Sequence, residues 1–119
     1  MSADSQLLRI VDDGDIVEAR FAVDTIIDEA CIRDIGDQLQ AAVRDRQEPN
    51  CLVNFDGVQH LSSAALGMLI DLNSTVQECN GRLALAGIDG TISEVFKITK
   101  LDRVFAIHDT AAEARADLR

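Results

Sequence analysis

Two short runs near the start of the chain, residues 7–11 and 16–21, have the composition of β-strands. In the second run every other residue from Val17 to Phe21 is apolar, which is the period of a strand with one polar face. An Asp-Gly pair lies between the two runs, and this pair favours a tight turn. The pattern therefore predicts an antiparallel hairpin at the N-terminal end.

The period then changes to that of helices. From about Asp28 the apolar residues recur three or four positions apart, with Asp28 as the predicted N-cap and Pro49 beyond the C-terminal end. A second and wider apolar stripe runs from Ser62 to the Asn-Gly pair at residues 80–81, where a left-handed residue is expected to stop the helix. Both helices have an apolar face suited to lying on a sheet.

Three further strands and two further helices complete the pattern. Residues 51–55 and 83–86 are apolar without alternation, as in parallel strands covered on both faces, and residues 104–107 form another short strand. Capping boxes of the form Thr-x-x-Glu, which begin at Thr91 and Thr110, are expected to open the last two helices.

The resulting order, ββαβαβαβα, predicts an α/β fold. A hairpin is followed by strand-helix units with right-handed crossovers, which gives a mixed sheet of four or five strands and about four helices. The length of 119 residues and the scarcity of proline and glycine favour a single domain that spans residues 1–119.

The charge of the chain excludes several classes of partner. Lys and Arg number 11 and Asp and Glu 21, so the net charge is 11 − 21 = −10, which repels nucleic acid and anionic membranes. Neither Trp nor Tyr is present to stack on bases. No apolar run approaches the ~18 residues of a membrane span, and no signal peptide is recognisable, so we expect a cytoplasmic protein.

The candidate chemistry is sparse. Three widely spaced cysteines support neither a disulfide framework nor a zinc site, and the motifs of nucleotide binding, metalloproteases and serine hydrolases are absent. A catalytic triad could be drawn from Ser63, His60 and Asp56, but residues so close along one loop rarely converge in that geometry. His60 and His108 are interpreted as surface or structural residues. We therefore expect neither an enzyme, nor a metal site, nor a cofactor.

The Ser62–Ser63 pair lies where a buried strand leads into the central helix. A hydroxyl at this position can cap the helix, or it can accept a phosphate that the unpaired N–H groups of the first turn would stabilise. The residues alone leave both roles of this pair open, that of a helix cap and that of a modification site.

Several segments together resemble a known family. The anti-sigma factor antagonists of the STAS superfamily (sulfate transporter and anti-sigma antagonist domains) are similar in sequence and order at residues 54–56, 58–67, 81–85, 95–102 and 105–107. The resemblance runs from about residue 7 to residue 116 and covers nearly the whole chain.

The resemblance implies a partner switch. In the family, a serine at the start of the central helix is phosphorylated by the anti-sigma factor, a GHKL-type serine kinase that uses ATP. The unphosphorylated antagonist binds this kinase and releases a sigma factor, and a phosphatase acts on the phosphoserine. The family signature, Asp-Ser-[Ser/Thr]-Gly-Leu-Gly, makes Ser63 the acceptor here, with Ser62 as the second candidate. The resemblance implies the following partner-binding residues: Asp28, Asp56, Ser62, Ser63, Ala64, Leu66 and Gly67.

Three residues depart from the signature, because Ser62, Ala64 and Ala65 replace its Asp, its second hydroxyl residue and its first Gly. Without the Asp carboxylate to orient the hydroxyl, phosphorylation is expected to be slow or to need a divergent kinase. Two alternatives remain open. One is a STAS scaffold of stressosome or lipid-transport type that serine phosphorylation does not switch, and the other is an acyl- or phosphoryl-transfer enzyme. A homodimer is a further assembly that the resemblance allows.

Overall fold

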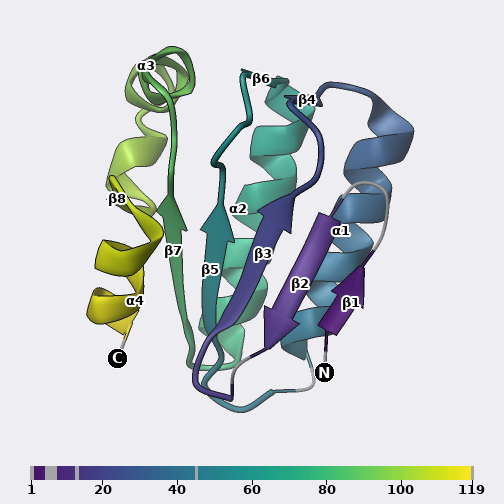
Figure 1. Cartoon of the computed structure of the whole chain (residues 1–119), viewed down its shortest axis with the longest axis vertical. Coiled ribbons are helices and arrows are strands. Elements are labelled where there is room, and N and C mark those ends of the chain that lie inside the picture. The colour runs from purple at the N-terminus through teal and green to yellow at the C-terminus, as the bar shows by residue number, and fades with distance from the viewer. Residues whose placement is uncertain (1, 5–7, 13, 45, 119) are drawn as a thin grey trace.

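A mixed six-stranded sheet forms the centre of the computed structural model, which describes residues 2–4, 8–12, 14–44 and 46–118 (Figure 1). The strand order is β1-β2-β3-β5-β7-β8. Its strands are β1 (Ser2–Asp4), β2 (Leu8–Asp12), β3 (Val17–Phe21), β5 (Asn50–Asn54), β7 (Arg82–Ala86) and β8 (Ala106–His108). Strands β1, β2 and β3 pair antiparallel, and β3, β5, β7 and β8 pair parallel.

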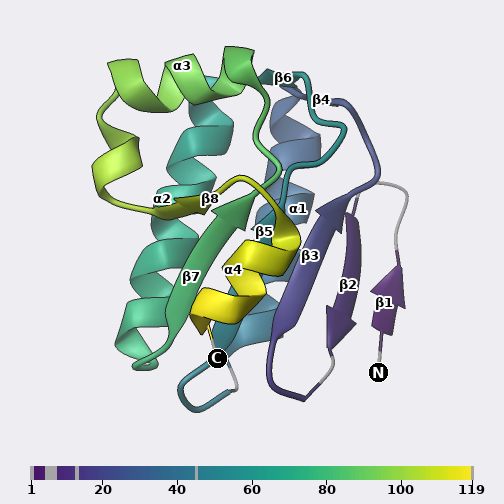
Figure 2. The ribbon, with the colours of Figure 1, turned by 60° about the vertical axis from the view of Figure 1, so that its left-hand side comes forward.

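Within the described ranges, four helices and one short 3-10 turn accompany the sheet. They are α1 (Glu29–Arg44), α2 (Ser63–Glu78), α3 (Gly90–Ile98), the 3-10 turn η1 (Leu101–Arg103) and α4 (Ala111–Leu118). Helices α1 and α2 cover one face of the sheet and α4 covers part of the other, while α3 lies beyond the ends of the parallel strands (Figures 1 and 2). The α/β class and the element order predicted from the sequence are confirmed.

Strands β5 and β7 bury side chains on both faces, as their apolar runs predicted. In β5, Cys51 and Val53 pack in the larger cluster under α1 and α2, whereas Leu52 packs in the smaller cluster under α4. The apolar stripes of α1 and α2 supply most of the helical side of the larger cluster. Burial on both faces explains why the sequence of β5 shows no polar alternation.

The end of α2 follows the predicted mechanism. Asn80 adopts a left-handed conformation with φ of 60°, its N–H donates to the carbonyl of Gln77 at 3.0 Å, and the N–H of Gly81 donates to Val76 at 2.8 Å. These two bonds form a Schellman motif. Gly81 is required for a different reason, because a Cβ there would lie 2.1 Å from the carbonyl oxygen of Pro49.

Two expectations about the C-terminal third are wrong in detail. Asp89, not Thr91, caps α3, since the Asp89 carboxylate accepts from the N–H of Ile92 at 2.9 Å and the helix begins one residue before Thr91. The last strand begins at Ala106 rather than at residue 104, because the 3-10 turn at residues 101–103 delays it. The cap of α4 at Thr110 is confirmed, as its Oγ1 accepts from the N–H of Glu113 at 3.2 Å.

The N-terminal hairpin is confirmed, with Ile10 opposite Ala19 in its register. Residue 7, where the first strand was expected to begin, and the Asp13 of the turn lie outside the described residues. Strand β1 adds an edge strand that the sequence did not predict.

Among the described residues, no helix is both long enough and apolar enough to cross a membrane.

Candidate functional site

The loops at the carboxyl ends of β3 and β5 are bound to each other. They form a small two-stranded parallel sheet of β4 (Thr25–Ile26) and β6 (His60–Leu61), which lies directly before α1 and α2 (Figure 1). The carbonyl of Asp24 accepts from the N–H of Gln59 at 2.7 Å, and the carbonyl of Ile26 accepts from the N–H of Ser62 at 3.0 Å. The two loops therefore hold the start of α2 at a defined place beside the start of α1.

The two serines at the start of α2 have different roles. Ser62 is the N-cap, with extended backbone, and its Oγ accepts from the N–H of Ala65 at 3.3 Å. Ser63 is the first helical residue, and its side chain is exposed. Within the part of the chain that the structure describes, the Ser63 hydroxyl has no hydrogen-bond partner. Of the two hydroxyls, only that of Ser63 is left both accessible and uncommitted.

A row of four phenylalanines supports this end of the sheet. The ring centroids of Phe21 and Phe55 lie 5.0 Å apart, those of Phe55 and Phe96 6.5 Å, and those of Phe96 and Phe105 6.1 Å. All four side chains are buried, and these spacings are those of favourable aromatic pairs. The row connects β3, the turn after β5, α3 and the segment before β8 through buried ring contacts.

Asp56 lies in a tight turn directly after β5. The N–H of Val58 donates to the carbonyl of Phe55 at 2.9 Å, and Gly57 takes the positive φ of 89° that a type II turn requires at its third position. The N–H of Asp56 donates to Oδ1 of Asn54 at 2.9 Å, so the exposed carboxylate stands on an anchored backbone. Gly87 packs against this turn, where a Cβ would come within 2.9 Å of the Asp56 nitrogen.

Asp28 lies directly before α1, at the predicted cap position, and two residues beyond the Ile26 that binds Ser62. Its backbone carbonyl accepts from the N–H of Ile32 at 2.9 Å, and its carboxylate accepts from the thiol of Cys31 at 3.4 Å. That hydrogen bond, with the negative charge of the carboxylate, raises the pKa of the Cys31 thiol. Asp28 is exposed, and it carries a negative charge at the same end of the molecule as Ser63.

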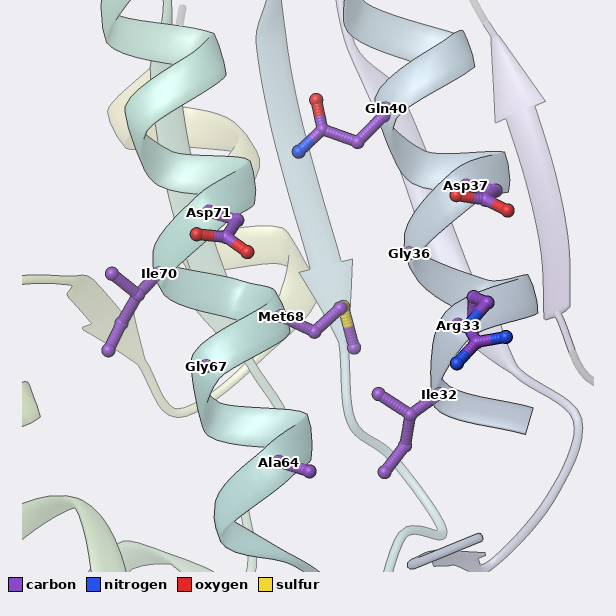
Figure 3. A pocket seen from close by; sticks show the side chains of 10 residues that line it. All are labelled: Ile32, Arg33, Gly36, Asp37, Gln40, Ala64, Gly67, Met68, Ile70 and Asp71. Atoms are coloured by element: carbon purple, nitrogen blue, oxygen red, sulfur yellow. The ribbon is translucent and has the colours of Figure 1, made fainter. Parts of the chain in front are cut away.

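The remaining expected site residues lie on the first two turns of α2 and divide into two groups. Leu66 is buried with 6% of its surface exposed, so its side chain belongs to the core and not to a partner surface. Ala64 and Gly67 line an open groove between α1 and α2 (Figure 3). The sequence did not predict this groove, because it depends on how closely two helices approach each other.

The geometry does not assemble a catalytic triad. His60 is exposed on β6, and no hydrogen bond joins Ser63, His60 and Asp56, all three of which the structure describes. Nor do any three His, Cys, Asp or Glu side chains of the described ranges gather as metal ligands would. The arrangement offers an exposed, uncommitted hydroxyl on the first residue of α2.

The sequence and the fold both relate the chain to known proteins. The family model for the STAS domain matches residues 10–114. A Thermotoga neapolitana protein, named as an inferred anti-sigma factor antagonist, is 29% identical over 68 residues, which are 57% of this chain and 60% of the relative. A Thermotoga maritima protein with a similar name is 29% identical over 62 residues, which are 52% of this chain and 55% of the relative. The matches therefore span little more than half of the relatives' lengths.

Solved structures share the fold at lower identity. A STAS domain protein described as an anti-sigma factor antagonist from Planctomyces limnophilus superposes with a TM-score of 0.84 at 21% identity, covering 94% of this chain and 97% of that one. The phosphorylated form of the Bacillus cell-fate determinant SpoIIAA superposes with a TM-score of 0.72 at 18% identity, covering 94% and 99%. Because the family match extends over most of the described elements, from β2 to α4, this chain belongs to the STAS domain family.

Proposed function

We propose that this chain is an anti-sigma factor antagonist that binds a GHKL-type serine kinase while Ser63 is unphosphorylated, and thereby releases a sigma factor. The division between the two serines carries the proposal, because Ser62 caps α2 and Ser63 is exposed with an uncommitted hydroxyl. The family membership and the names of the Thermotoga relatives support the same role. In this role the chain is a substrate and a binding partner, and it catalyses no reaction itself.

The fold can accept a phosphate at Ser63. The first N–H groups of α2 have no intrahelical partner, and the helix dipole favours negative charge at that end. A phosphate adds about −1.5 to −2 charge at neutral pH, and with this compensation the free energy of unfolding should change by less than about 1 kcal/mol. The solved phosphorylated form of SpoIIAA, which shares this fold, is consistent with that expectation.

The same phosphate would weaken a complex with the kinase. A charged group that enters an interface must lose its hydration and meet whatever negative charge the kinase presents there, including its bound nucleotide phosphates. Like-charge contacts of this kind cost several kcal/mol, and about 3 kcal/mol corresponds to roughly a hundredfold loss of affinity. A phosphatase that removes the group would restore binding.

The proposed binding surface follows from the geometry around Ser63. It consists of Asp28, Asp56, Ser62, Ser63, Ala64 and Gly67. The β4–β6 pairing brings the loops that carry Asp28, Asp56 and Ser62 to the start of α2, where Leu66 is a core residue. A rigid surface of this kind can bind without a large ordering cost.

The experiment compares wild type, Ser63→Ala and the phosphorylated protein in titrations with a GHKL-type kinase, together with intact-mass analysis after incubation with ATP. We expect one phosphate on wild type, none on Ser63→Ala, and an affinity that falls about a hundredfold on phosphorylation only. Equal affinity of the bare and phosphorylated forms would refute the switch. Phosphate on Ser62 with Ser63 unmodified would move the acceptor by one residue.

A second function is favoured by the departures from the family signature. Ser62, Ala64 and Ala65 stand where the signature has Asp, a hydroxyl residue and Gly, and these changes suit a STAS scaffold that binds partners without a serine switch. Ser62 still performs the capping that an Asp would provide, so only the carboxylate is lost. Kinase binding without any phosphate transfer would support this alternative.

A further inference from the structure

The open groove between α1 and α2 is a surface to which the fold assigns no role. It extends from Ile32 to Gln40 on α1 and from Ala64 to Asp71 on α2 (Figure 3). At 1.5 Å per residue, each wall is roughly 11–12 Å long, which is about two helical turns. A groove of this length between two helices matches two turns of a third helix.

Gly67 is the feature that the fold alone does not explain. It lies inside α2, where glycine is less stable than alanine, yet a Cβ at this position would meet nothing within 4 Å. Gly36, across the groove, differs, because a Cβ there would lie 3.0 Å from Cγ of Met68. Gly36 thus permits the close approach of the helices, whereas Gly67 leaves empty space above α2. A partner side chain that enters this space would explain why residue 67 is a glycine.

The chemistry of the groove defines what it can receive. Ile32 and Met68 form apolar walls, and Ile70 is 41% exposed at the edge of α2. Asp37 and Asp71 contribute two carboxylates to the lining against the single guanidinium of Arg33, on a chain of net charge −10. Apolar side chains flanked by lysine or arginine complement such a surface.

The far end of the groove carries an unsatisfied acceptor. Oε1 of Gln40 is buried and has no hydrogen-bond partner among the described residues, while the amide nitrogen points toward α2 (Figure 3). An unpaired buried acceptor is unfavourable, because it has lost its hydrogen bonds to water. A flip of the Gln40 side-chain amide would exchange its oxygen and nitrogen. Oε1 would then lie on the side of α2, where a basic side chain of a partner can donate to it.

We propose that this groove continues the partner-binding surface and receives an apolar helix face of the kinase that bears lysine or arginine. The inference rests on the proposed function, and continuity supports it, because Ala64 and Gly67 belong both to the groove and to the surface around Ser63. The kinase would thus be held by two adjoining regions, of which phosphorylation controls only the one at Ser63.

The test pairs two glycines that accept a side chain equally well. Gly67→Gln fills the groove, and Gly90→Gln is its control, because a Cβ at Gly90, the first residue of α3, also meets nothing within 4 Å. Purified GHKL-type serine kinases of the source organism are titrated one by one with each variant, and melting temperatures verify the folds. We expect Gly67→Gln to lower the affinity at least tenfold and Gly90→Gln to lower it less than threefold.

A second pair of variants tests the charge of the groove. Asp71→Lys should lower the affinity about tenfold, whereas Glu113→Lys on α4, on the opposite face of the sheet, should change it less than threefold. When the concentration of this chain is varied as the substrate, Gly67→Gln should raise the KM of the kinase for it.

The outcomes separate the two proposals. If a kinase binds wild type and Gly67→Gln equally, or if Gly90→Gln weakens binding as much as Gly67→Gln, the groove is not part of the interface and the proposed function stands. If no kinase binds wild type, both are overturned. If wild type self-associates in sedimentation and Gly67→Gln does not, a second copy of the chain occupies the groove, and the kinase assignment is wrong.

Discussion

The N–H of Ser62 donates to the carbonyl of Ile26 at 3.0 Å, across 36 residues of sequence. The side chain of Ile26 is fully buried, so this bond joins the cap of α2 to the backbone of a residue anchored in the core. The position of the candidate acceptor Ser63 therefore depends on a loop that precedes the other helix. Loops bound in this way can present a modification site with little backbone freedom.

Truncation of this anchor should disturb the site as well as the fold. Ile26→Ala removes a fully buried side chain and should lower the free energy of unfolding by about 2–5 kcal/mol. Ile16→Ala is the matched control, because Ile16 is equally buried but packs under α4 on the other face of the sheet. Chemical denaturation should show similar losses, while only Ile26→Ala slows phosphorylation of Ser63 under conditions where both variants are folded. Equal rates would show that the loop does not position the acceptor.

The two serines should respond differently to substitution. Ser62→Ala removes the cap and should cost about 1 kcal/mol of stability, whereas Ser63→Ala should cost only a few tenths, since alanine suits the first turn. Ser62→Asp retains a cap, places a negative charge at the helix N-terminus and should recover the stability. Thermal melting compares the three variants. A larger loss for Ser63→Ala than for Ser62→Ala would show that the Ser63 hydroxyl also holds the helix.

The sequence predicted the long elements, in which the hydrophobic period repeats several times, and missed the shortest ones. The stripes of α1 and α2 and the apolar run of β5 each extend over enough residues to show a period, and their positions were predicted closely. Strands β4 and β6 have two residues each, too few for any pattern, although their pairing positions the site. Local signals cannot reveal a ladder whose partners are far apart in sequence.

The error at α3 has a different cause. Thr91 and Glu94 fit a capping box, but Asp89, two residues earlier, is an equally good cap and is followed by a glycine that the first turn accepts. Because Asp89 and Thr91 both fit a cap, the sequence alone does not decide between them, and the direction in which the chain leaves β7 does. As a result, the cap of α3 is the carboxylate of Asp89 and not the hydroxyl of Thr91.

The buried ion pair between β3 and α4 should make stability depend on pH. Glu18 is 1% exposed, and its Oε1 accepts from Nη2 of Arg115 at 2.6 Å, while Oε2 accepts from Arg20 and from Asn54. Burial alone raises the pKa of Glu18, but the hydrogen bonds from Arg20, Arg115 and Asn54 outweigh it and hold the pKa below its ordinary value. The stabilisation is complete above the unfolded-state pKa of about 4.5 and is lost as the pH falls through the lower pKa of the folded state.

Glu18→Gln tests this linkage. At pH 7 this substitution should lower the free energy of unfolding by about 3 kcal/mol. This is the low end of the range for breaking a buried ion pair, because the side chain of Arg115 is partly exposed to water. The difference from wild type should shrink as the pH is lowered below about 4.5 in urea titrations. Asp117→Asn, which removes the exposed negative charge beside Arg82 and His108, should cost less than about 1 kcal/mol. A loss at Glu18 that does not vary with pH would assign its role to packing rather than to charge.

Replacement of Gln40 should stabilise the free protein and weaken its complex. Gln40→Leu removes the buried, unpaired Oε1 and retains nearly the same volume, so the free energy of unfolding should rise by about 1 kcal/mol. Gln38→Leu is the control, because Gln38 lies on the same helix and is not without an interaction partner. If a basic side chain of the kinase pairs with Gln40 in the complex, the same Gln40→Leu variant binds the kinase less tightly although its fold is more stable. Denaturation and titration measured together distinguish this from a general effect on stability, which would change both quantities in the same direction.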